Sequence, residues 1–186
     1  MLKSILIGLD GSPSSEAAVE LGIQWAKPFK ALLVGLGIVD EATIRTPEAE
    51  PIGGGYYKYE RDEELVKETR RKIQQFLEQF GTRCADADIS FNLLQNSGMP
   101  YEEILRESQR YDLVLFGHET HFRFGTVDRP DETLWNVLKR GPRPVVIWYR
   151  STRRDGANQR QSSDDRAIPL VLVAAPSTAT SRPMAR

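Results

Sequence analysis

Residues 4–13, SILIGLDGSP, decide the fold of this protein. The run Ser4–Leu9 is apolar after its first residue, which is typical of a strand that is covered on both faces of a sheet. A turn at Asp10 and Gly11 follows, and Ser12-Pro13 provides a helix N-cap and a proline at the first helical position. A buried strand that passes directly into a helix indicates an α/β protein.

The same alternation continues to about residue 150. Further apolar runs predict strands at Ala31–Val39, Ile89–Gln95, Asp112–Phe116 and Pro144–Tyr149. Helical spacing and helix-start signals predict helices after Pro13, around Leu65–Phe80, over Pro100–Ser108 and over residues 132–140. Residues 41–59 are expected to form a loop long enough to be a flexible lid. The alternation predicts a five-stranded parallel, doubly wound (Rossmann-like) sheet with helices on both faces.

The composition excludes several classes of protein. The chain has 186 residues, 25 Lys+Arg against 26 Asp+Glu, and one cysteine, Cys84. The balanced charge argues against a general nucleic-acid binder, and a single thiol excludes a disulfide framework. No apolar run approaches the roughly 20 residues that cross a bilayer, and no signal peptide precedes the first strand. We therefore expect a soluble cytoplasmic protein without a membrane or nucleic-acid partner.

The end of the chain has a different composition. Residues 1–150 are expected to form the α/β domain, and residues 151–167, whose only apolar residues are alanines, a polar linker. The tail, residues 168–186, begins with the apolar run Ile168–Ala175. Because a single strand is not stable alone, this run must pair with a sheet edge or remain unpaired.

A ligand site is expected at the carboxyl ends of the strands, as in other open parallel sheets. There Asp10 and Gly11 precede a helix N-terminus, which suits an anion, or a ribose hydroxyl bound by the carboxylate. The alternative is that Asp10 and Ser12 only cap the helix.

Four segments carry a family resemblance. Lys3–Ser12, Gly37–Asp40, Tyr111–His118 and Gly141–Ile147 resemble, in order and spacing, the universal stress protein family over about residues 1–150. The resemblance implies a five-stranded α/β domain that is usually dimeric, often through its last strand, and that binds ATP in many members but not in others. The tail resembles the start of a truncated second repeat, with Pro176 in place of Asp10.

The phosphate motif of the ATP-binding members is damaged. In them a Gly, two residues, a Gly and nine residues precede Gly-Ser or Gly-Thr. Gly117 matches the first position, but Thr120 stands at the second. The last pair aligns with Pro130-Asp131 or with Asp131-Glu132, and Gly125-Thr126 has the wrong spacing. Carboxylates at this place would repel phosphate.

The residues that the family uses to bind adenosine match this sequence better than the phosphate motif does. Asp10 matches the family's acidic residue after the first strand, and Ile38 matches the position whose backbone contacts adenine. We therefore expect no cofactor, or weak binding of ATP or AMP. In an alternative, Arg123 and Arg129 replace the missing glycines. The candidate cofactor-binding residues are Asp10, Gly11, Ser12, Ile38, Gly117, His118 and Thr133.

Two histidines, His118 and His121, lie near Glu119 and Asp128 in the sequence. No metal site is expected, because a metal needs three or more converging ligands in a framework that this loop lacks. No residue is assigned a catalytic role, because no nucleophile accompanies a base. We expect His118 to line the mouth of the pocket.

Aromatic residues suggest two contact surfaces. Tyr56, Tyr57 and Tyr59 are expected to pack over the pocket, with stacking on a base or a partner as the alternative. Trp148 and Tyr149 are large for an edge strand, and an exposed apolar edge promotes aggregation. Residues 144–149 are therefore expected to form a homodimer interface.

These features favour a homodimeric universal stress-type regulatory protein that binds ATP weakly or not at all and acts on an unknown protein partner. The alternative is an adenine-nucleotide-binding switch (ATP or AMP) with an altered phosphate loop. An enzyme ranks last, because the sequence offers no set of nucleophile, metal ligands and oriented base.

Overall fold

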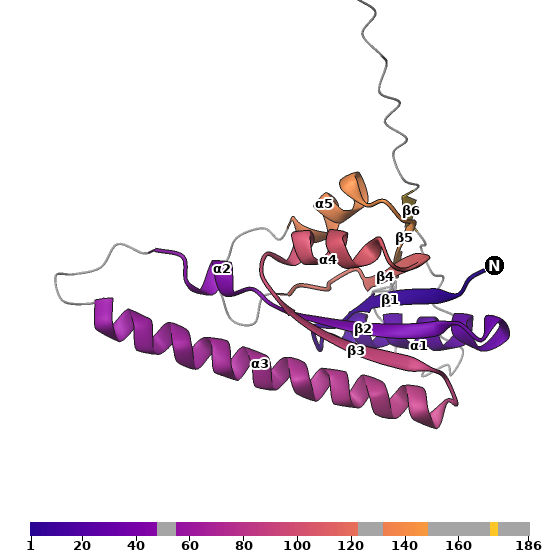
Figure 1. The fold of residues 1–186 in the computed structure, drawn as a ribbon, viewed down its shortest axis with the longest axis horizontal. Coiled ribbons are helices and arrows are strands. Elements are labelled where there is room, and N and C mark those ends of the chain that lie inside the picture. The colour runs from indigo at the N-terminus through magenta and orange to yellow at the C-terminus, as the bar shows by residue number, and fades with distance from the viewer. Residues whose placement is uncertain (48–54, 123–131, 149–171, 175–186) are drawn as a thin grey trace, which may run out of the picture.

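The computed structural model describes residues 1–47, 55–122, 132–148 and 172–174. They form one six-stranded sheet in the order β3-β2-β1-β4-β5-β6 (Figure 1). The strands are β1 (Ser4–Gly8), β2 (Leu32–Val39), β3 (Phe91–Ser97), β4 (Leu113–Gly117), β5 (Val145–Trp148) and β6 (Leu172–Ala174). The helices are α1 (Pro13–Phe29), α2 (Glu41–Ile44), α3 (Gly55–Asp86), α4 (Pro100–Ser108) and α5 (Thr133–Arg140).

The parallel part of the sheet agrees with the prediction. The pairs β1–β2, β2–β3, β1–β4 and β4–β5 are all parallel, and the strand order reverses direction between β1 and β4. The carboxyl ends of β1 and β4 are therefore neighbours at the switch point, where a ligand site was predicted.

Helices cover both faces, as the apolar strands require. Two core clusters lie on opposite sides of the sheet, one with residues of α1 and α3 and the other with residues of α4 and α5 (Figure 1). Along β2 the side chains alternate between them, so Leu36 and Ile38 face α4 while Gly35 and Gly37 face α3. A Cβ on Gly37 would lie 2.3 Å from Cγ2 of Ile73, so the glycine lets α3 approach the sheet closely.

The predicted loop over residues 41–59 is wrong at both ends. Glu41–Ile44 forms α2, capped by Asp40 Oδ1, which accepts a hydrogen bond from Thr43 N at 3.0 Å. The helix α3 already begins at Gly55 and extends past the sheet beside α2 (Figure 1). Ion pairs join α3 to Glu41 of α2 and to Arg45, the residue after α2, and such pairs leave no simple periodic signal in the sequence.

The tail run contributes the sixth strand. Leu172–Ala174 pairs with β5 in antiparallel orientation, so one part of Ile168–Ala175 does pair with a sheet edge. The rest of that run, residues 151–167 of the predicted linker, and Tyr149 lie outside the described residues.

In the part of the chain that the structure describes, no helix is both long and apolar enough to cross a membrane.

Candidate functional site

The turn between β1 and α1 is organised by Asp10. Its Oδ1 accepts hydrogen bonds from the backbone N–H of Ser12 at 3.0 Å and from Ser12 Oγ at 2.7 Å. Ser12 Oγ in turn accepts from Ser15 N at 3.1 Å and so caps α1. Gly11 between them has φ +75°, a conformation that glycine adopts without strain. Three of the predicted residues are thus together, and the capping role weighed for Asp10 and Ser12 is present.

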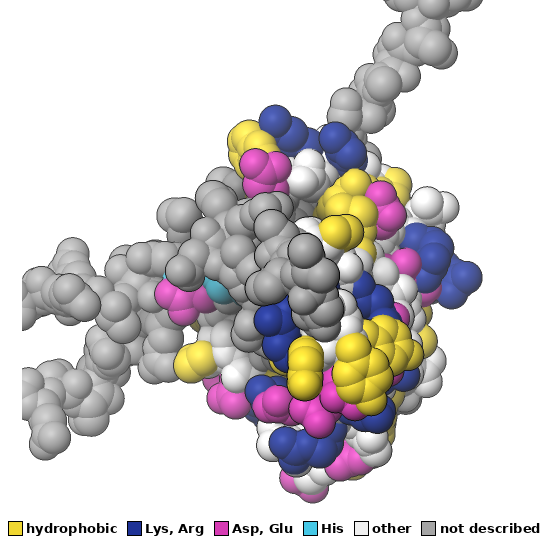
Figure 2. Space-filling view, turned by 90° about the vertical axis from the view of Figure 1, so that its left-hand side faces the viewer, with side chains coloured by type: hydrophobic (Ala, Val, Ile, Leu, Met, Phe, Trp, Pro, Cys, Tyr) yellow, Lys and Arg dark blue, Asp and Glu magenta, His cyan; other side chains and the backbone are white. Residues whose placement is uncertain are grey.

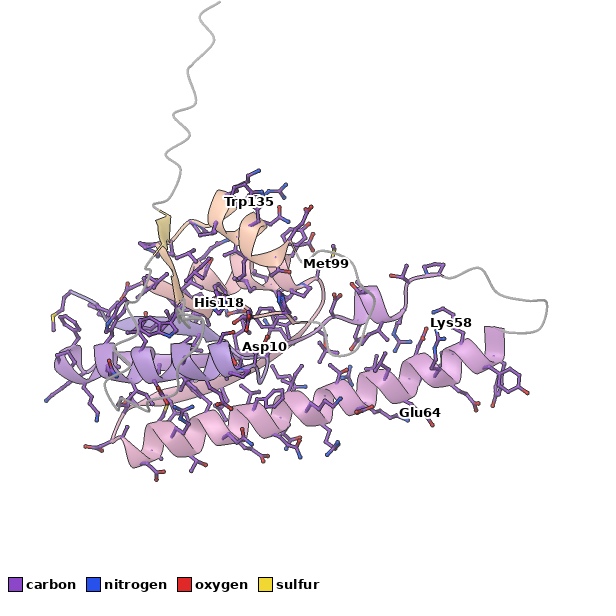
Figure 3. All side chains as sticks on the ribbon, turned by 180° about the vertical axis from the view of Figure 1, so that it is seen from behind. Asp10, Lys58, Glu64, Met99, His118 and Trp135 are labelled. Atoms are coloured by element: carbon purple, nitrogen blue, oxygen red, sulfur yellow. The ribbon has the colours of Figure 1, made fainter. Side chains whose placement is uncertain are left out.

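The segment after β4, residues 118–122, folds onto this turn. The backbone N–H of His121 donates to Asp10 Oδ2 at 2.5 Å, and that of Glu119 donates to Ser14 Oγ at 3.2 Å. Both oxygens of Asp10, whose carboxylate was expected to bind a ribose hydroxyl, thus accept hydrogen bonds from the chain itself. Figure 3 labels Asp10 and His118 at this edge of the sheet.

Two side chains anchor the segment in the protein interior. Phe122 is fully buried, and its ring meets that of Phe116 edge-to-face, with the centroids 6.3 Å apart and the planes at 87°. Thr120 is also fully buried, and its Oγ1 has no hydrogen-bond partner among the described residues. Where the ATP-binding members have the second glycine of their phosphate motif, this chain thus has a threonine whose side chain is buried.

Gly117, the remaining match to the phosphate motif, packs against α1. A Cβ on this residue would lie 2.2 Å from the backbone C and O of Ser14. The lack of a side chain therefore lets the end of β4 contact the first turn of α1. The next residue, His118, donates from its N–H to Trp148 O at 2.9 Å, and its Nε2 lies 3.4 Å from Glu119 Oε1.

The other predicted site residues are less accessible. Ile38 is fully buried in the core on the α4 side, opposite Asn96 of β3. Thr133 is buried at the start of α5. The N-cap of this helix is Glu132, whose side chain makes no capping hydrogen bond. Asp128, Arg123, Arg129 and the candidate pairs within residues 125–131 lie outside the described residues.

Sequence reasoning missed Ser14, the His121 backbone and the anchor Phe122. Ser14 follows an N-cap serine and a proline, so its place in the sequence indicates only a first-turn residue. The N–H of His121 carries no sequence signal at all, because every residue except proline has one.

The predicted packing of the tyrosines over the pocket is wrong. Tyr56, Tyr57 and Tyr59 are 67%, 75% and 60% exposed in the first turns of α3. Figure 2, which looks from the side where α3 begins, shows hydrophobic side chains at the surface there. Because α3 starts earlier than expected and projects past the sheet, its first turns have no core beneath them.

A charged cluster lies close by, at the ends of β2 and β3. Glu41 Oε1 accepts from Arg70 at 2.5 Å, and this bond lowers the pKa of the Glu41 carboxyl. Asn96 Nδ2 donates to Glu103 Oε2 at 3.0 Å and Glu107 Oε1 at 3.4 Å, so the chain's own groups also engage these buried carboxylates.

Within the described ranges, no group of three or more His, Cys, Asp and Glu side chains is placed to hold a metal ion. A cavity of about 370 Å³ lies between α1 and α3, on the opposite face from Ile38. Its lining includes Gly11, Ser15, Phe76 and Arg83, and of the predicted site residues it contains Gly11 alone.

This chain is similar to known proteins of one family. The model of the universal stress protein family matches residues 1–148. The solved structure of hypothetical protein MJ0577 has a TM-score of 0.60 at 21% identity, covering 82% of this chain and 99% of that one. A universal stress protein in complex with cAMP has a TM-score of 0.52 at 18% identity, covering 78% and 95%.

A universal stress protein family protein from Arabidopsis thaliana with AMP bound has a TM-score of 0.52 at 14% identity, covering 88% of this chain and 98% of that one. At these identities the three structures establish the fold. A comparison with curated protein sequences gives no match.

Proposed function

Because the chain belongs to the universal stress protein family, we propose that it is a cytoplasmic regulatory protein of the stress response that acts by binding a protein partner. In this proposal it binds ATP weakly or not at all. The carrying observation is the 2.5 Å hydrogen bond from His121 N to Asp10 Oδ2.

This bond supports the proposal because it uses the acceptor that a ribose hydroxyl would need. The other oxygen of Asp10 accepts both donors of Ser12. A nucleotide that used Asp10 would compete with these donors for its oxygens. Because His121 is exposed, its N–H can bond to water instead, and the loss of this hydrogen bond costs about 0.5–1.5 kcal/mol, which reduces affinity roughly 2-fold to 10-fold.

The phosphate side supports the same conclusion. In the ATP-binding members small residues bring backbone N–H groups to the phosphates. Here Gly117 contacts α1, Thr120 and Phe122 fill the interior, and Glu132 stands at the N-cap of α5. A carboxylate at a helix N-terminus competes with phosphate for the positive end of the helix dipole.

Calorimetric titration of the full chain with ATP, ADP and AMP, each with and without magnesium, tests the proposal. We expect no ATP binding tighter than about 1 mM, which corresponds to a free energy of about −4 kcal/mol. Micromolar ATP binding that is lost in Asp10→Asn would overturn the proposal. If micromolar ATP binding survives this substitution, the ATP site does not use Asp10. The prediction of weak or no ATP binding would then be wrong, but the structural role of Asp10 would stand.

A nucleoside monophosphate is the second candidate ligand. The relatives whose structures contain cAMP and AMP show that this fold accommodates ligands with a single phosphate. Such a ligand does not need the second half of the phosphate motif. Binding of AMP alone in the same titrations would favour a nucleotide-binding switch.

We also propose that two copies pair through residues 144–149. The edge of β5 is apolar, with Val145 and Val146 buried and Ile147 and Trp148 half-buried. An apolar sheet edge pairs readily with another strand. In the structure β6 lies on this edge, so pairing with a second copy requires β6 to leave it.

A further inference from the structure

We propose that β6 is a capping strand that competes with a second copy of this chain for the edge of β5, and so keeps the full chain monomeric. This inference rests on the dimer proposed above and adds its regulation. The edge strand would be free for a partner copy only when β6 is released.

The structure shows how β6 caps the edge. Val145 lies opposite Ala174, Val146 opposite Val173 and Ile147 opposite Leu172. On its other side β5 pairs with β4, where Trp148 lies opposite Gly117. The described residues of β6 thus cover the edge of β5 from Val145 to Ile147.

The same edge fits a second copy of itself. Two β5 strands in antiparallel orientation around a two-fold axis would place Val-Val-Ile-Trp against an identical sequence, which is the geometry of an isologous interface. This pairing brings aromatic and β-branched side chains into contact across the interface, a favourable class of cross-strand pair. β6 offers the same edge the residues Leu-Val-Ala instead.

Covalent linkage favours β6 over a second copy. A strand joined to its own sheet acts at an effective concentration on the order of 1 mM, whereas a second copy acts at its actual concentration. β6 therefore holds the edge at low protein concentration, and a second copy can take the edge only when the pairing of β6 is weakened.

The test is the mass in solution of full-length variants. We expect the wild-type chain at about 10 µM to have the monomer mass, 21.0 kDa, since the linked strand outcompetes a second copy at this concentration. Leu172→Pro removes the backbone donor of β6 opposite Ile147, whose own backbone groups point away from β4, and we expect its mass to be about twice the monomer value. Ser163→Pro, which places the same residue between β5 and β6, is the matched control and should stay monomeric.

A second pair of variants keeps the test interpretable if proline alone disturbs folding. Val173→Asp should also give the dimer. In Val146→Cys with Val173→Cys, the two thiols lie opposite each other and should form an intramolecular disulfide that locks the monomer. Burial raises the pKa of the Cys84 thiol to about 11, so this residue should not compete in the oxidation.

Each outcome decides between the two proposals. If Leu172→Pro and Val173→Asp both stay folded and monomeric, the β5 dimer and its regulation are overturned together. If the wild type is dimeric and the disulfide-locked variant is monomeric, the dimer uses this edge and the capping role alone is overturned. If both are dimeric, the dimer does not use this edge and both proposals are overturned. None of these results bears on the nucleotide titrations, which test the ligand proposal separately.

Discussion

Asp10 is the residue on which the account of the site depends. Both of its carboxylate oxygens accept hydrogen bonds from the chain, from Ser12 on one side and His121 on the other. An acidic residue after the first strand is therefore used here to join the β1–α1 turn to the segment after β4. It has the position of a ligand-binding residue and the contacts of a structural one.

Replacement of Asp10 should therefore destabilise the fold. We predict that Asp10→Ala lowers the free energy of unfolding by about 2 kcal/mol, because it leaves the donors of Ser12 and His121 without their acceptor. Urea denaturation measures this. Asp10→Asn keeps one oxygen and should cost less. An unchanged stability in Asp10→Ala would show that the residue is not structural.

Asp112 gives a prediction with a defined pH dependence. Its Oδ2 accepts from Lys3 N at 2.7 Å and Ser4 N at 3.1 Å, and these bonds lower the pKa of the carboxyl. Because the folded pKa lies below the unfolded value of about 3.9, the stabilisation is present above that pH and is lost as the pH falls through the folded pKa.

Accordingly, Asp112→Asn should lower the free energy of unfolding by about 1 kcal/mol at neutral pH. The difference from the wild type should shrink as the pH falls below about 4. Urea titrations across this range measure both values. A difference that stays constant down to the acid limit would contradict the assignment.

Among the elements, the segment 118–122 depends on Phe122. We predict that Phe122→Ala lowers the free energy of unfolding by about 3 kcal/mol, because it removes a fully buried ring from the contact with Phe116. The half-exposed Phe29 provides the control, and Phe29→Ala should cost about 0.5 kcal/mol. Equal effects of the two substitutions in denaturation experiments would show that the segment is not anchored by Phe122.

The elements also show how far sequence reasoning reaches. Each predicted strand and the helix Pro100–Ser108 are present, because apolar runs and the N1 proline are local signals. The start of α3 at Gly55 was missed, since its first turns are exposed and its ion pair with Arg45 leaves no simple periodic signal. The pairing of β6 with β5 could not be derived either, because the partner of a short apolar strand is decided by tertiary contacts.

The candidate site divides in the same way. The turn at Asp10, Gly11 and Ser12 follows from its residue types and was located correctly. The hydrogen bond from His121 was not foreseeable, because a backbone donor leaves no trace in the sequence. The damaged phosphate motif was visible from the sequence, but the inward packing of Thr120 required the structure.

In the whole molecule, the candidate site and the proposed dimer edge are adjacent. The N–H of His118 donates to the carbonyl of Trp148, which joins the segment after β4 to the last residue of β5. Release of β6 would therefore expose an edge next to the segment that covers Asp10. A partner that binds at this edge would lie next to the turn at Asp10, where the sequence predicts a ligand site.

The most direct test of the central claim is amide hydrogen exchange at His121 in the full chain, with and without ATP. We predict a protected amide, since it is bonded to Asp10, and unchanged protection at about 1 mM ATP, the limit set for the titrations. Exchange at the rate of an exposed amide, or loss of the Asp10 contact at micromolar ATP, would contradict the claim that the chain itself closes this site.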